Sequence, residues 1–130
     1  TLTKEERVQT VQEAVSNLKN VRVVVQDGGL TVEAAKQLGA TVLLRGVRNS
    51  QDLELEKTLA YHNHRLDEKI ETVLLMSEPA HEYVSSTMVK ELAKFGGEFD
   101  SLVPESVAKI LKKIYVEQEF QQMKLQERSE

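Results

Sequence analysis

The chain has 130 residues, of which 40% are hydrophobic, and this size is typical of one domain that buries its own core. It contains no cysteine, which excludes a disulfide framework, a cysteine nucleophile and a cysteine zinc site. A formal charge of −4 and an aromatic content of only 5% argue against nucleic acid or an anionic membrane as a partner. No stretch reads as a membrane span or a signal peptide. We therefore expect a cytoplasmic protein with a small ligand.

Apolar spacing and capping residues predict alternating helices and strands in the first half of the chain. Thr3 and Glu6 have the spacing of a capping box and open a predicted helix over residues 3–18. A run dense in β-branched residues predicts a buried strand over residues 21–25. A helix over residues 31–38 and a second buried strand over residues 41–44 follow.

The second half continues the same alternation. It predicts a helix over residues 52–65, a strand over residues 70–76, a helix over residues 88–95 and a last helix after Pro104. The last helix passes into a polar helical tail, so we divide the chain into a domain over residues 1–116 and a tail over residues 117–130. Strands that are apolar on both faces and alternate with helices predict a Rossmann-like, three-layer α/β/α fold with a parallel sheet.

Ligands of open parallel sheets bind beyond the carboxyl ends of the strands, and two segments fit that position. Ser85, Ser86 and Thr87 precede a predicted helix, where backbone N–H groups, hydroxyls and the helix dipole favour a phosphate group. The alternative for this segment is simple N-capping, which a single hydroxyl satisfies.

Arg45 and Arg48 flank Gly46 directly after the second predicted strand. Two guanidinium groups at this position can grip phosphates in bidentate fashion. The alternative is a surface pair of arginines that faces acidic side chains of the next helix, namely Asp52, Glu54 or Glu56. The arginines by themselves favour neither interpretation. Together with Ser85, Ser86 and Thr87, they favour phosphate binding.

Other familiar sites are missing from the sequence. It has no GxxxxGK[ST] phosphate loop, no GxGxxG dinucleotide fingerprint and no GxSxG nucleophile elbow. His62 and His64 lie two residues apart on a predicted helix and so point away from each other, which excludes joint metal binding from one face. We predict no metal ligands in the chain.

Six segments of the chain also occur, in the same order and spacing, in one enzyme family. They are TKEERV, LGATVLLRGVRNSQDLELE, NHRL, IETVLLM, VSSTMVKELAKFGG and LVPESV. The combination of RGVR, a downstream DxExE and VSST at a helix start is specific, although each alone is weak. Over residues 3–114 the sequence resembles the bacterial phosphopantetheine adenylyltransferases.

The resemblance implies transfer of the adenylyl group of ATP to 4′-phosphopantetheine, with magnesium, giving dephospho-coenzyme A and pyrophosphate in coenzyme A synthesis. It implies contacts to ATP or its phosphates by Arg45, Gly46, Arg48, Glu56, Val84, Ser85, Ser86 and Thr87. Of these, Arg48, Ser86 and Thr87 would act on the reacting phosphates. It also implies a pantetheine channel along Leu30, Thr31, Arg45, Asn63 and Glu91, coenzyme A or its precursor as a ligand, and a homohexamer.

The chain departs from the family pattern in three places. Leu53 and Leu55 replace aromatic residues, and His81 stands where relatives often place an aromatic ring near adenine. Relatives also begin with a strand and a GxFDPxxxGHxxI motif, so we expect about 40 further residues in the parent protein, including two strands between residues 21–25 and 41–44 of this sheet. The alternative function is a noncatalytic binding or assembly module.

Overall fold

The computed structural model describes residues 2–127, which form two compact units. The central unit comprises Gln26–Tyr83, and the terminal unit comprises the described segments before and after it. Each unit has its own hydrophobic cluster.

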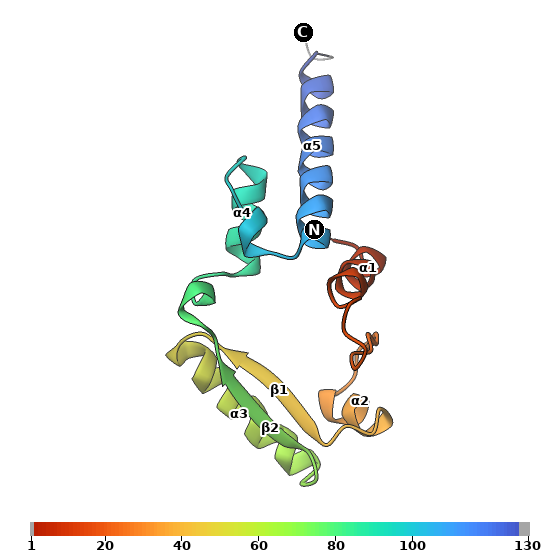
Figure 1. The fold of residues 1–130 in the computed structure, drawn as a ribbon, viewed down its shortest axis with the longest axis vertical. Coiled ribbons are helices and arrows are strands. Elements are labelled where there is room, and N and C mark those ends of the chain that lie inside the picture. The colour runs from red at the N-terminus through yellow and green to blue at the C-terminus, as the bar shows by residue number, and fades with distance from the viewer. Residues whose placement is uncertain (1, 128–130) are drawn as a thin grey trace. The chain divides into compact units, whose positions relative to one another are not determined.

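The central unit is built on a parallel βαβ arrangement (Figure 1). Its elements are α2 (Thr31–Gln37), β1 (Val42–Val47), α3 (Ser50–Leu66), β2 (Glu71–Met76) and a short 3₁₀ helix (Pro79–His81). The two strands pair in parallel with Leu44 opposite Val73 and Gly46 opposite Leu75. Helices combined with a parallel sheet confirm the predicted α/β class.

Local signals in the sequence set the position of α3. Asn49 is the N-cap, and its side-chain oxygen accepts a hydrogen bond of 2.9 Å from the backbone N–H of Asp52. The helix therefore begins at Ser50, two residues earlier than the apolar spacing predicts. It contacts both strands and runs alongside them (Figure 1). Glu56 is its buried residue, and its carboxylate lies on the side of α3 that meets β1.

The two faces of the sheet have different surroundings in the described chain. Val47 is fully buried, and Leu43 packs against the cluster formed by Val32, Ala35 and Ile70. Alternate strand residues point the other way and are 43–62% exposed; they are Val42, Leu44, Val73 and Leu75. The face that carries Leu43 and Val47 also carries Arg45, which places this arginine toward α3.

The strand predicted over residues 21–25 is wrong. Residues 21–27 have no regular secondary structure, and Val21, Val24 and Val25 are 44–49% exposed. A β-branched run becomes a strand only where another strand pairs with its backbone, and within the described residues the only ladder joins β1 to β2.

The terminal unit is helical. It contains α1 (Lys4–Ala14), α4 (Ser86–Lys94), a 3₁₀ helix (Asp100–Leu102) and α5 (Glu105–Glu127). The predicted capping box is confirmed, because Thr3 Oγ1 accepts from the N–H of Glu6 at 3.2 Å and Glu6 Oε2 accepts from the N–H of Thr3 at 2.8 Å. The first helix is shorter than predicted and ends at Ala14, after which a turn extends to Leu18.

Helices α4 and α5 pack around one core, and α1 contacts α5. The buried members of the core are Val89, Phe99, Ala108 and Leu111. Ser106 Oγ donates a hydrogen bond of 2.9 Å to the backbone oxygen of Thr10, which joins α5 to α1. Helix α5 is continuous across residue 116 and extends to Glu127. Within the described residues, no helix is both long enough and apolar enough to cross a membrane.

Candidate functional site

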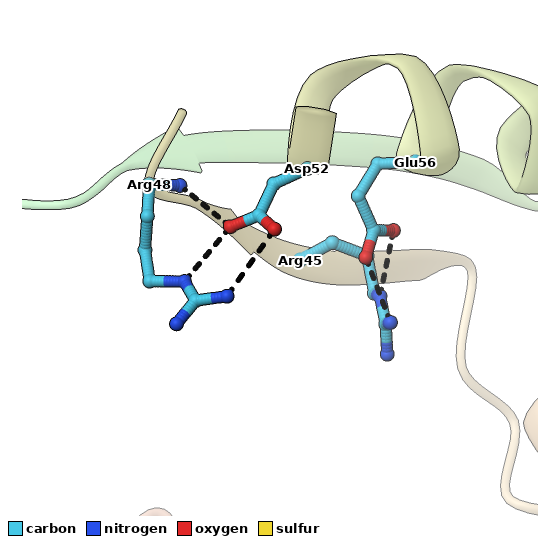
Figure 2. A network of polar contacts seen from close by, with 4 residues as sticks. All are labelled: Arg45, Arg48, Asp52 and Glu56. Atoms are coloured by element: carbon cyan, nitrogen blue, oxygen red, sulfur yellow. Dashed lines mark hydrogen bonds and ion pairs between the residues drawn. The ribbon is translucent and has the colours of Figure 1, made fainter. Parts of the chain in front are cut away.

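A bidentate ion pair in the central unit joins β1 to α3. Arg45 donates from Nε to Glu56 Oε2 and from Nη2 to Glu56 Oε1, both at 2.8 Å (Figure 2). This is the bidentate geometry in which a guanidinium and a carboxylate bind most strongly. The Glu56 side chain is 8% exposed, whereas the Arg45 side chain is 51% exposed. The carboxylate is therefore enclosed while the guanidinium remains open to solvent.

The pair shifts the protonation equilibria of both side chains. Hydrogen bonds from Arg45 lower the pKa of Glu56, and burial only partly opposes this effect. The same hydrogen bonds raise the pKa of Arg45. At neutral pH the site thus holds a charged carboxylate and a charged guanidinium.

A second arginine and carboxylate pair lies one turn earlier on α3. Asp52 Oδ2 accepts from Arg48 Nε at 2.9 Å and from the Arg48 backbone N–H at 3.1 Å, and Oδ1 accepts from Nη2 at 3.3 Å (Figure 2). These bonds lower the pKa of Asp52, with the side-chain bond from Arg48 as the largest cause. Both arginines therefore face acidic side chains of α3. This is the pairing with Asp52 and Glu56 that the sequence offered as the alternative to phosphate binding. Glu54 instead pairs with Lys57 at 3.2 Å.

A small cavity of about 110 Å³ brings several predicted ligand residues together in the central unit. Its lining includes Thr31, Arg45, Glu56 and Asn63, and Thr72 of β2 with apolar side chains of β1 and α3 completes the wall. Thr31 is the first residue of α2, and Asn63 lies two turns beyond Glu56 on α3. Residues predicted for the phosphates and residues predicted for the pantetheine channel thus share one cavity.

The serine run forms the start of α4 in the terminal unit. Ser85 is the N-cap, and its hydroxyl accepts from the N–H of Met88 at 3.2 Å. Ser86 and Thr87 are exposed and begin the helix, so their N–H groups precede the first intrahelical hydrogen bond. One hydroxyl therefore performs the capping, and two further hydroxyls lie beside the positive end of the helix dipole.

A larger cavity of about 460 Å³ opens beside this helix start. Val84, Ser85 and Ser86 line it together with two cationic residues, Arg7 and Lys90. Sequence reasoning missed both cations. Lys90 follows the serine run by one helical turn, which is a signal that could have found it, but Arg7 comes from α1 and has no local link to the run.

The remaining predicted residues lie apart from these two cavities. Leu30 is the N-cap of α2 and is 50% exposed, and Glu91 is an exposed residue of α4. Gly46 occupies β1 opposite Leu75, with open space where a Cβ would lie. The arginine pairs belong to the central unit and the serine run belongs to the terminal unit. Each group is therefore a partial site in its own unit.

Comparison with known proteins identifies the family. The cytidylyltransferase-like family matches residues 1–92. A phosphopantetheine adenylyltransferase from Streptococcus pneumoniae strain ATCC 700669 is 48% identical over 103 residues, and one from strain JJA is 47% identical over the same length. Each match covers 79% of this chain and 64% of the relative, so the chain spans less than two thirds of the relatives' length. These matches confirm the resemblance stated from the sequence, and the chain belongs to the cytidylyltransferase-like family.

Proposed function

We propose that the protein transfers the adenylyl group of ATP to 4′-phosphopantetheine, giving dephospho-coenzyme A and pyrophosphate. The observation that carries the proposal is the bidentate Arg45 and Glu56 pair, which fixes an exposed guanidinium on β1. The strand extends to Val47 rather than ending at Leu44 as predicted, so Arg45 lies two residues before its carboxyl end. A guanidinium held this way suits a phosphate group. The 48% identity to phosphopantetheine adenylyltransferases supports the choice of substrates.

The reaction needs positioning and charge neutralisation rather than a protein nucleophile. A phosphate oxygen of 4′-phosphopantetheine attacks the α-phosphorus of ATP and forms the new phosphorus–oxygen bond. The bond from the α-phosphorus to the bridging α,β-oxygen breaks, its electron pair stays on that oxygen, and pyrophosphate leaves. No proton has to move in this step, so arginines, hydroxyls, helix N–H groups and the magnesium ion that accompanies ATP suffice.

The proposal assigns these roles to groups that the chain presents. Arg45 and Arg48 bind phosphate oxygens and offset the negative charge that gathers in the transition state. Ser86 and Thr87 supply hydroxyls and the first N–H groups of α4 for the triphosphate. Thr31 and Asn63 line the path of the pantetheine arm beside Arg45.

Magnesium enters the proposal as the counter-ion of ATP and therefore as part of the substrate. Within residues 2–127, no three acidic, histidine or cysteine side chains are grouped so that they could hold an ion. Asp52 and Glu56 already accept hydrogen bonds from Arg48 and Arg45, the arginines of the proposed phosphate site. The phosphates of ATP are the natural magnesium ligands at such a site.

By the same resemblance the proposal includes a cytoplasmic location and assembly into a homohexamer. Light scattering coupled to gel filtration of the protein measures the assembly directly. A mass six times that of the subunit agrees with the proposal, and a monomer contradicts this part of it.

The proposed chemistry is tested by mixing the complete gene product with ATP, magnesium and 4′-phosphopantetheine and separating the nucleotides by chromatography. Dephospho-coenzyme A is the expected product. If nicotinate mononucleotide is adenylylated instead, the acceptor is wrong but the class of reaction stands. If ATP or coenzyme A binds in calorimetry and neither acceptor yields product, the protein is a noncatalytic binding module.

A further inference from the structure

We propose that the second half of α5, residues 116–127, pairs in the antiparallel direction with the same segment of a second copy of this chain. The inference goes beyond the proposed function and does not rest on it. The match to the cytidylyltransferase-like family ends at residue 92, and the resemblance stated from the sequence ends at residue 114. Neither of them assigns a role to this segment.

Helix α5 packs against the core of the terminal unit along its first half. Ala108 and Leu111 are buried there, and Tyr115 is the last residue of α5 that packs against this core. The helix then continues to Glu127 and extends past α4 (Figure 1). Because most helices in proteins are stabilised by packing of an apolar face, an apolar stripe on this extension indicates a partner.

Three side chains form such a stripe. Val116, Phe120 and Met123 follow one another at intervals of four and three residues, which places them on one side of the helix. They are 55–64% exposed, although Lys124 Nζ lies 4.7 Å from the centroid of the Phe120 ring. Alternating intervals of four and three residues are typical of the seam between two paired helices. The stripe therefore fits a second helix.

The terminal unit leaves room beside the start of the stripe. A cavity of about 410 Å³ opens there, and Val116 and Glu119 line it together with residues 96–100. The end of a partner helix can lie against this opening.

The charges that flank the stripe favour a second copy in the antiparallel direction. Lys113 precedes Val116 by three residues and Glu127 follows Met123 by four, so both lie on the side of the helix that carries the stripe. A parallel pair would place each of these charges beside its own copy. An antiparallel pair instead brings the acidic end of one helix to the basic end of the other, which is the complementary arrangement.

One register matches the apolar and the charged side chains together. In this register Phe120 packs against Met123 of the other copy, and Val116 lies opposite Glu127 at each end of the pair. Glu117 then lies beside Lys124 of the other copy, and the twofold symmetry of the pair forms this contact twice.

Introduced thiols test the contact, because the chain has no cysteine. Full chains with Val116→Cys and with Glu127→Cys are co-expressed, purified in the reduced state and oxidised with glutathione disulfide. In the proposed register these two thiols lie opposite each other, whereas two copies of the same thiol lie eleven residues apart, about 16 Å along the pair. We expect the mixed disulfide to form at least about tenfold faster than a disulfide between identical chains.

The matched control is a mixture of chains with Gln118→Cys and with Leu125→Cys. These positions have the same alignment along the pair but lie on the side of α5 opposite the stripe. Their mixed disulfide should form at least about tenfold more slowly than that between positions 116 and 127.

Charge reversal tests the direction of pairing by the strength of association. Sedimentation of the full chain over a range of concentrations gives the dissociation constant, and a chain that ends at Tyr115 shows how much of the association depends on this segment. Glu117→Lys and Lys124→Glu should each weaken the association about tenfold, because each replaces two attractive contacts by repulsive ones. The double variant should restore it, and Gln118→Lys, on the opposite side, should leave it unchanged.

A parallel pair gives the opposite result for the double variant. It would place Glu117 beside Lys112 and Lys124 beside Glu119 of the other copy, so that reversing both charges makes both contacts repulsive. A double variant weaker than either single variant therefore overturns the inference, as does a disulfide that forms fastest between identical chains.

Two further results overturn it. One is a mixed disulfide between positions 116 and 127 that forms no faster than the control. The other is a chain ending at Tyr115 that associates as strongly as wild type, or a wild type that stays monomeric at every concentration. None of these measurements uses enzyme activity, so failure of the proposed function and failure of this inference are separate results.

Discussion

Removal of Arg45 should destabilise the central unit more than removal of Glu56, although the two side chains make the same contact. Arg45→Ala leaves a carboxylate that is only 8% exposed without its partner, and an uncompensated buried charge is costly. Glu56→Ala leaves a guanidinium that is 51% exposed, which water can solvate. The pair is open to solvent on the arginine side, so breaking it should cost less than breaking a fully buried pair. We expect the free energy of unfolding to fall by about 2 kcal/mol in Arg45→Ala and by about 1 kcal/mol in Glu56→Ala.

Urea unfolding followed by circular dichroism measures both free energies of unfolding, and amide exchange of β1 shows that the change lies in the central unit. The defect of Arg45→Ala should shrink as the pH falls below about 5, because an unpaired buried carboxylate has a raised pKa and becomes neutral. Glu54→Ala, at an exposed position of the same helix, is the control and should change stability little. Equal losses for the two substitutions, or a larger loss for Glu56→Ala, would refute the reasoning.

Three further predictions concern stability. The pKa values of Glu56 and Asp52 are lowered in the folded state. The stability that these carboxylates contribute is therefore present above their unfolded pKa of about 4 and is lost as the pH falls through their folded values. Between about pH 5 and pH 2, the thermal midpoint of the double variant Glu56→Gln/Asp52→Asn should change less than that of wild type. Thr3→Ala removes the capping box and should cost about 1 kcal/mol, with faster amide exchange in the first turn of α1, whereas unchanged exchange would contradict the assignment. Gly96 has a φ of +73°, which is in the left-handed region. In thermal unfolding, Gly96→Ala should therefore cost about 1 kcal/mol of stability and Gly96→Asn less. Equal stability of wild type and both variants would argue against a left-handed residue at this position.

Elements with a local signal could be predicted from the sequence. The capping box at Thr3, helix α2 and strand β2 lie within one or two residues of their predicted bounds, because capping hydroxyls, glycines and apolar spacing act over a few neighbouring residues. The strand over residues 21–25 could not be decided this way. Its β-branched residues favour an extended chain, but a strand also requires a neighbour for its backbone, and that depends on the rest of the sheet.

The candidate site shows the same division between local and distant contacts. Arg48 and Asp52 are four residues apart, and their pairing was among the alternatives that the spacing allowed. Arg45 and Glu56 are eleven residues apart, and whether they pair depends on how α3 packs against β1. The cavity shared by Thr31 and Asn63, and the place of Arg7 beside Ser86, likewise come from tertiary packing that no short pattern reports.

The proposed function is tested most directly in the reverse reaction. The complete gene product is incubated with dephospho-coenzyme A, magnesium and pyrophosphate, and ATP formation is followed by luminescence, in wild type and in Arg45→Ala. We predict that wild type forms ATP only when dephospho-coenzyme A is present, and that Arg45→Ala slows ATP formation at least about 100-fold, as expected when a charged donor to the reacting phosphates is removed. No ATP from a wild-type protein that binds dephospho-coenzyme A, or an Arg45→Ala variant as active as wild type, would contradict the account.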